Sequence, residues 1–325
     1  MPIDNADIQS NPLAGTGAQS ANPDFRLQYS VEGGEKHATG LYQWMSALNI
    51  KGGASTRALM LVTRYNGDLP GRPVGLFSDP LGPVAVRRMV QQLDAVASAN
   101  LPKSTGGGNP MGPTPRLEYQ HGPHSISGAF NRGDQVFVNA IAPVVGDLIA
   151  LMSEMLTKPE RAVAVSVEQA GSGRRGLRLQ FRLTNVGTGD VIVADPRLVS
   201  PVSPKPRGFV QVSPWPVTVP GQPARPPVWQ RIALDAAPRD TEDTEDTGVT
   251  IKPQESVVFQ SALWTAPASA VFVAQAVWED YHGPVKIDPT KVQPPIPPEP
   301  GTDDRPFVVR GAAFSKYVRV EAGAA

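Results

Sequence analysis

Five carboxylates crowd one short stretch of this chain. In "RDTEDTEDTG" (239–248) they are Asp240, Glu242, Asp243, Glu245 and Asp246. Carboxylate oxygens suit Ca²⁺, and an EF-hand loop needs acidic residues at alternate positions, a glycine sixth and a glutamate twelfth. Counted from Asp243, Gly248 falls at the sixth place, but the twelfth is Gln254 and the flanks are typical of strands. We therefore favour a solvated loop, or an acidic contact for a basic partner protein, over a metal site.

A second group of chemically active side chains lies in "EYQHGPHSIS" (118–127), where Glu118, His121 and His124 follow one another at intervals of three. On a helix this spacing would place all three on one face, as zinc ligands require. Gly122-Pro123 lies between the histidines and predicts a turn instead. Whether the three side chains converge in a pocket is open from sequence alone. A pocket that joined Glu118, His121 and another carboxylate would favour a hydrolase.

Other signatures of catalysis are missing from the sequence. It has no G-x-S-x-G elbow, no P-loop, no G-x-G-x-x-G that opens a helix, and no cysteine. We therefore expect a protein that is not an enzyme and that uses no cofactor and no metal. Trp215, in "VSPWPVTVP", is an aromatic side chain between prolines. It is a candidate partner anchor together with the acidic run, and the alternative is a loop pinned to its own domain.

Charge and hydropathy limit the partners. Thirty Lys and Arg residues balance thirty Asp and Glu residues, so there is no basic excess for general nucleic-acid binding. The first 23 residues contain no Lys or Arg and no apolar core of a secretory signal. No run approaches 18 uninterrupted apolar residues. We expect a soluble cytoplasmic protein, not bound to a membrane, whose partner is another protein; its oligomeric state is open.

The first half of the chain predicts a domain of mixed type. Residues 1–23 are polar and are expected to be a disordered tail. Alternation from Phe25 predicts a strand that turns at Gly33-Gly34, and a second strand ends at Asn66-Gly67. Apolar residues at helical spacing predict amphipathic helices over 83–99 and 143–158, the second starting at Pro143. Its apolar stripe comprises Val144, Val145, Leu148, Ile149, Met152, Met155 and Leu156. The expected unit is an α+β domain over 24–158.

Beyond the second helix, the pattern changes to short alternating strands. "RAVAVSVEQ" and "LRLQFRLTN" flank the hairpin loop "AGSGRRG", and "VIVADP", "PVWQRIALD", "ESVVFQSALW", "SAVFVAQAVWED" and "RPFVVRGAAFSKYVRVEA" follow. Strands separated by turns in this way predict an all-β immunoglobulin-like antiparallel sandwich over 159–325. A proline-rich excursion over 285–305 interrupts it. Because the junction at 157–161 is short, the two domains are expected to pack together.

Three phrases carry a family resemblance: "LQYSVEGGEK", "LRLQFRLTNVGTGDVIVADP" and "IKPQESVVFQSALW". The last two resemble bacterial immunoglobulin-like modules, and the combination is similar to cytoplasmic immunity proteins of type VI secretion or contact-dependent toxin systems. The resemblance implies a non-catalytic protein-binding inhibitor that neutralises a toxin domain by occluding it. It transfers no functional residue. The alternatives are a structural or adaptor module of a larger bacterial assembly and a cryptic hydrolase.

Overall fold

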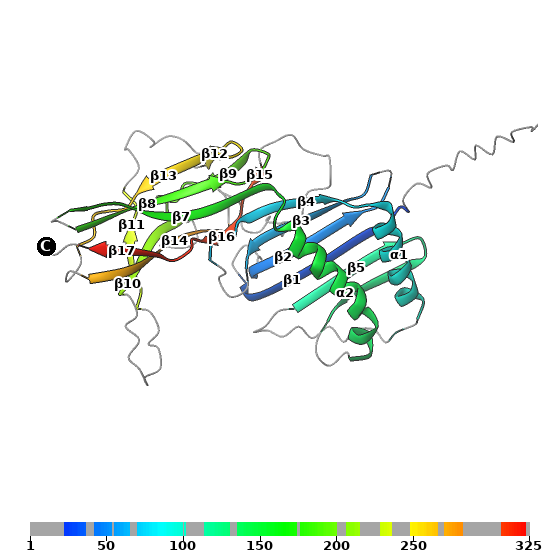
Figure 1. The fold of residues 1–325 in the computed structure, drawn as a ribbon. Coiled ribbons are helices and arrows are strands. Elements are labelled where there is room, and N and C mark those ends of the chain that lie inside the picture. Colours follow the sequence, from blue (N-terminus) through cyan, green and yellow to red (C-terminus); the bar gives the residue numbers. More distant parts are fainter. Residues whose placement is uncertain are drawn as a thin grey trace, which may run out of the picture.

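Antiparallel β-sheet dominates this computed structural model (Figure 1). The structure describes residues 23–36, 42–53, 55–65, 70–99, 101, 114–130, 135–173, 176–199, 206–214, 228–235, 248–265, 270–281 and 307–322. Within these ranges seventeen strands form three sheets, and two helices cover part of the largest sheet. The architecture is largely β and sandwich-like.

The largest sheet has nine strands in the order β13-β8-β7-β4-β3-β2-β1-β5-β6. Its members in chain order are β1 (Arg26–Lys36), β2 (Tyr42–Lys51), β3 (Arg57–Arg64), β4 (Val74–Pro80), β5 (Thr114–His121), β6 (His124–Ala129), β7 (Pro159–Gly173), β8 (Gly176–Asn185) and β13 (Ser256–Gln260). Every neighbouring pair in this sheet is antiparallel. The predicted hairpin around "AGSGRRG" is confirmed, because Gly173 pairs with Gly176.

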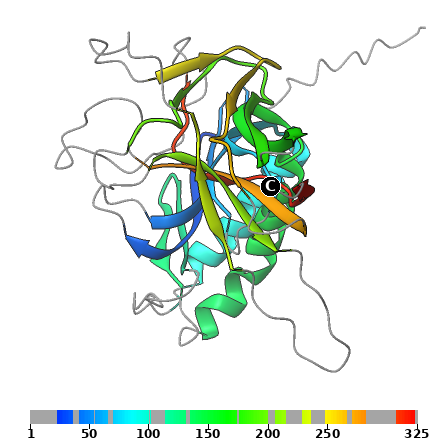
Figure 2. The same cartoon turned by 90° about the vertical axis from the view of Figure 1, so that its left-hand side faces the viewer.

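Two smaller sheets complete the sandwich. One has the order β11-β10-β14-β16, with β17 also paired to β14, and the other has the order β12-β9-β15. Their strands are β9 (Val191–Ala194), β10 (Gly208–Pro214), β11 (Gln230–Ala233), β12 (Gly248–Ile251), β14 (Ala270–Asp280), β15 (Phe307–Val308), β16 (Gly311–Phe314) and β17 (Val318–Ala322). Inward-facing residues of β7, β8 and β13 form one core with those of β10, β11 and β14, and Trp278 lies fully buried in it. Figure 2 looks at the molecule from this sandwich end.

The two helices are α1 (Pro83–Ser98) and α2 (Gln135–Met155), and both pack on the same face of the sheet. The predicted helix over 83–99 is confirmed, with Pro83 in its first turn and Val86, Val90 and Leu93 buried. These side chains meet a second core made with inward-facing residues of β1, β2, β3 and β5. Amphipathic spacing is what places this stripe against the sheet.

The second helix begins eight residues earlier than predicted. It starts at Gln135, so Pro143 lies inside the helix instead of opening it. Proline removes one intrahelical hydrogen bond, but Pro143 lies on the exposed side, where water can satisfy the carbonyl it leaves unpaired. By length and composition alone α2 also resembles a membrane-crossing helix; 28% of its most apolar stretch is buried in the fold. Its buried residues are Phe137, Ile141, Val144, Leu148 and Met155.

The predicted turn at Gly33-Gly34 is wrong. Strand β1 continues through it, and Gly33 pairs with Trp44 of β2. The register shifts between Gly33 and Lys36, so the glycines mark an irregularity in the ladder, which is the other common use of glycine in a strand. Asn66-Gly67, residues 1–22 and the proline-rich excursion at 285–305 lie outside the described residues.

The nine-stranded sheet crosses the junction between the two predicted domains. Strand β7 pairs with β4, for example Val74 with Val163, as well as with β8 of the sandwich. A second contact across the junction joins Gly311 of β16 to Thr63 of β3. Gly311 has a φ of +132°, and a Cβ at this position would collide with the carbonyl oxygen of Thr63. The boundary at 158–159 remains a prediction, but hydrogen bonds and packing both span it.

Candidate functional site

The residues proposed from sequence as partner contacts lie outside the described residues. These are Asp240, Glu242, Asp243, Glu245, Asp246 and Trp215. The strands on either side of the acidic run are described: β11 ends at Ala233 and β12 begins at Gly248. The expected strand-like flanks are therefore confirmed, whereas an EF-hand loop would join two helices.

The histidine segment forms a hairpin at the edge of the large sheet. Strand β5 ends at His121 and β6 begins at His124, so Gly122-Pro123 is the predicted turn. Gly122 has a φ of +53°, and proline fixes the next φ at a negative value, the signs of a type II′ hairpin turn. His121 and His124 are directly opposite each other and so share a face.

Glu118 does not join these histidines. Side chains alternate along a strand, and Leu117 and Tyr119 of β5 are buried beneath the helices while Glu118 is exposed. Glu118 therefore faces the opposite side of the sheet from His121. The group of three that the spacing suggested is divided by the strand itself.

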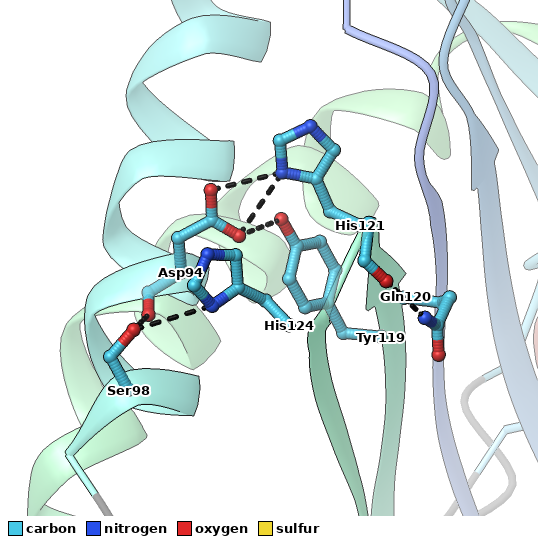
Figure 3. A network of polar contacts seen from close by, with 7 residues as sticks. Asp94, Ser98, Tyr119, Gln120, His121 and His124 are labelled. Carbon is cyan, nitrogen blue, oxygen red and sulfur yellow. Dashed lines mark hydrogen bonds and ion pairs between the residues drawn. The ribbon is translucent and has the colours of Figure 1, made fainter.

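A different carboxylate meets the histidine. Asp94 of α1 accepts hydrogen bonds from the Tyr119 hydroxyl at 2.8 Å and from His121 Nδ1 at 2.9 Å (Figure 3). The Asp94 and His121 side chains are 24% and 29% exposed, so this pair lies at the boundary between core and solvent. Tyr119 itself is buried. Burial raises the pKa of its hydroxyl, and the hydrogen bond to Asp94 and the charge of Asp94 raise it further.

One turn further along α1, Ser98 contacts the second histidine. Ser98 Oγ lies 2.8 Å from the carbonyl oxygen of Asp94 and 3.3 Å from His124 Nδ1. A hydroxyl has one proton, and the carbonyl can only accept, so Ser98 donates to the backbone and accepts from the Nδ1–H of His124. His124 in this orientation does not withdraw the serine proton.

This arrangement differs from a nucleophilic triad in its connections. A triad requires one histidine that contacts both the carboxylate and the serine. In this hairpin the carboxylate contact belongs to His121 and the serine contact to His124. The network therefore braces the edge hairpin against α1. Within the described residues both imidazoles leave Nε2 without a hydrogen bond.

Sequence reasoning missed Asp94, although a signal exists. Asp94 lies four residues after Val90 and three before Ala97, both in the apolar stripe of α1, so it borders the packed face. A carboxylate at that position is placed to reach a neighbouring strand. Which strand it meets depends on the fold and cannot be read from the helix.

The outer face of α2 is a second notable surface. Val136 and Ile149 are 61% and 50% exposed, and Ala142, Gly146 and Ala150 are also exposed. Ile149 was predicted to belong to the buried stripe, and that prediction is wrong. The stripe is narrower than its apolar residues suggest, because the helix meets the sheet along one line of residues spaced three, four or seven apart.

No family model matches this chain, and the search of curated proteins gives no match either.

Proposed function

We propose that this chain is a non-catalytic protein-binding inhibitor, an immunity protein that acts in the cytoplasm and occludes a bacterial toxin domain. The observation that carries the proposal is the exposure of two large apolar side chains on α2, Val136 near its start and Ile149 in its second half. Exposed apolar side chains are common where proteins bind partners, because burying them against a partner removes apolar surface from water. Val136 and Ile149 supply the apolar area of this surface, and the exposed residues between them include the small Ala142 and Gly146 and the polar Asn139 and Asp147.

The remainder of the helical layer suits rigid binding. Arg88 of α1 pairs with Asp147 of α2 at 3.0 Å, and Lys158 pairs with both Glu154 and Asp79. The buried side chains of Ile141, Val144 and Leu148 hold α2 against the sheet, and these largely exposed ion pairs add little to that. A surface that does not rearrange loses less conformational entropy on binding, which favours the high affinity an inhibitor needs.

The acidic run would complement the apolar face. Asp240, Glu242, Asp243, Glu245 and Asp246 would attract a basic surface, such as that of a toxin which itself grips phosphates. In this proposal the apolar face sets the lifetime of the complex and the charges set the association rate. Added salt should therefore slow association more than it speeds dissociation.

The test begins with the protein that co-purifies with this chain from its native cells. An inhibitor should bind it at one fixed ratio, measured by light scattering after size exclusion, and should protect cells that express it as a toxin. The double substitution Val136→Asp with Ile149→Asp should weaken binding by about thirtyfold or more. Val258→Asp is the matched control, because Val258 is an exposed valine on β13, far from α2.

Two results would reject the proposal. One is an α2 variant that folds and binds as tightly as the unaltered chain. The other is moderate binding of several partners at variable ratios, which would instead identify an adaptor module.

A hydrolase is the second candidate, favoured by the Asp94–His121 pair. His121 has its Nδ1 held by the carboxylate and its Nε2 free within the described residues, which is how a general base is oriented. A panel of ester, amide and phosphodiester substrates tests it. Turnover that disappears in His121→Gln, with the fold retained, would place this candidate first.

The finer fold assignment is also a proposal. We infer that the sandwich is immunoglobulin-like and that the helix-covered part over 24–158 is an α+β domain. The antiparallel pairs and the shared core of β7, β8, β10 and β14 support the first, and the two helices on one sheet face support the second.

A further inference from the structure

Two aromatic rings lie stacked on the outer face of the sheet β11-β10-β14-β16, at the end of the molecule away from α2. Trp229 precedes β11 and Tyr317 precedes β17. Ile232 and Val320 of these strands face the sandwich core, so alternation places Trp229 and Tyr317 on the opposite, outward side. Their ring centroids are 5.9 Å apart and the planes differ by 19°. Tyr317 is 56% exposed, and Val228 beside Trp229 is 74% exposed.

The polar ends of this pair have no hydrogen-bond partner among the described residues. Within the described residues, the indole N–H of Trp229 and the hydroxyl of Tyr317 make no hydrogen bond. Other aromatics of this chain do find partners: Trp278 Nε1 donates to the Ala194 carbonyl and the Tyr65 hydroxyl to that of Pro73. The stacked pair thus offers flat apolar rings together with two donors that a ligand can use.

A cation extends the strip. Arg231 is two residues beyond Trp229 on the same side of β11, and its guanidinium lies 4.5 Å from the ring centroid of Phe209. In the described part of the chain Arg231 makes no ion pair, whereas Arg319 on the same sheet face pairs with Glu321. Within the described residues Arg231 can therefore receive a carboxylate without breaking an ion pair.

We propose that this strip, defined as Tyr317, Trp229 and Arg231, binds a proline-rich segment of a partner protein in the polyproline II conformation, with an acidic residue beside its prolines. Proline rings pack on aromatic faces, and the polyproline II backbone has no internal hydrogen bonds, so its carbonyls are free to accept from Trp229 and Tyr317. The carboxylate answers the charge of Arg231. The two rings are already stacked on each other, so binding should cost little further side-chain entropy.

The narrowness of the strip favours this occupant over a folded domain. A stable contact between two folded proteins covers about 800 Å² on each partner, far more than three side chains present. An extended segment needs only a line of contacts. The proposal is independent of the α2 face, because the two surfaces lie at opposite ends of the molecule (Figure 1).

The test uses a fluorescently labelled peptide, Pro-Pro-Ala-Pro-Pro-Glu-Pro, followed by fluorescence anisotropy. Because residues 294–300 of this chain read PPIPPEP and would compete with the peptide, the full-length protein is measured both unaltered and with alanine in place of the prolines of 294–300. We expect saturable binding with a Kd below about 1 mM. Tyr317→Ser, at an exposed position that tolerates substitution, should weaken binding about tenfold. Arg231→Glu should weaken it by a similar factor, and a peptide with Lys in place of Glu should recover affinity for that variant alone. Val228→Ser is the matched control and should bind as the unaltered chain does.

Three outcomes would overturn the proposal. The first is no binding of the peptide at millimolar concentration. The second is equal binding of a peptide in which alanine replaces every proline, which would reduce the contact to charge. The third is unchanged affinity in Tyr317→Ser when circular dichroism shows the variant folded.

Discussion

The Asp280–Arg207 and Asp94–His121 pairs are both contacts of a carboxylate with a basic side chain, but they differ in burial. Asp280 and Arg207 have side chains 0% and 4% exposed, with 3.4 Å between the closest charged atoms. Asp94 and His121 are about a quarter exposed and lie 2.9 Å apart. The first pair lies in the sandwich near the junction with β3, where Tyr281 accepts a hydrogen bond from Arg64. The second lies at the rim of the helical layer.

Burial decides what each pair can do. A buried ion pair is a weak source of net stability, but removal of one partner leaves a charge with no water around it. A pair at the rim keeps access to solvent, so its removal should lower the free energy of unfolding only slightly. The buried pair at the junction should therefore matter more for stability than the contacts at the rim of the helical layer. The following experiments test that difference.

The largest effect is expected at Asp280. Asp280→Asn should lower the free energy of unfolding by about 3–5 kcal/mol, because Arg207 stays charged and buried. Urea denaturation measures it. Asp235→Asn is the control: it pairs with Arg178, both side chains are about half exposed, and the expected change is below about 1 kcal/mol. Equal losses in the two variants would erase the distinction.

Gly311 tests the packing of the same junction. Gly311→Ala should cost about 3 kcal/mol, because its φ of +132° disfavours a side chain and the new Cβ would strike the Thr63 carbonyl. In contrast Gly146 has open space around it in α2. Gly146→Ala should stabilise the protein by up to about 1 kcal/mol, since alanine is the better helix former. Thermal melts of both variants measure these changes. An unchanged melting temperature in Gly311→Ala would show that the backbone at the junction can move to accept a Cβ.

Tyr119 should have an intermediate effect that depends on pH. Burial raises the pKa of Tyr119, Tyr65 and Tyr29, so folding favours their neutral phenols. Their contribution to stability is complete below the unfolded pKa of about 10 and is lost as the pH rises above it. Tyr119→Phe should cost about 1 kcal/mol at neutral pH through the lost hydrogen bond to Asp94, and its stability should fall less steeply above about pH 10. If the stability of Tyr119→Phe falls with pH as steeply as that of the unaltered chain, Tyr119 does not contribute to the loss of stability at alkaline pH.

Ser98 should give the smallest effect. Ser98→Ala removes a hydroxyl that bonds its own helix backbone, and alanine favours the helix, so stability should change by about 0.5 kcal/mol or less. Chemical denaturation at neutral pH measures the difference. A Ser98→Ala variant that abolishes a hydrolytic activity would show that the serine proton is not held by the Asp94 carbonyl.

Much of the fold follows from local pattern. Alternation identified β7, β8, β9, β13 and β14, and helical spacing identified α1, because each signal is complete within one element. Errors arose where a residue has two uses. Pro143 can open a helix or be tolerated on its exposed side, and Gly33 can turn a chain or interrupt a ladder.

The site required information that no local pattern carries. Asp94 and His121 come from a helix and a strand joined by a long connection, and only the order β1-β5-β6 brings them together beneath α1. The same holds for Arg207 with Asp280 and for Trp229 with Tyr317. Spacing along the chain wrongly suggested Glu118 as a partner of the histidines, because a spacing of three shares a face in a helix but changes face in a strand.

The pairing of β4 with β7 has a consequence for any attempt to divide this protein. A chain severed after Lys158 would leave each fragment with an unsatisfied strand, β4 in one and β7 in the other. The unpaired backbone N–H and C=O groups of such an edge strand can pair with strands of other molecules, and the strand that fits each edge best is the one in the missing fragment. We therefore expect the two pieces to behave as a split protein: aggregation-prone when expressed alone, and reconstituted by strand complementation when expressed together.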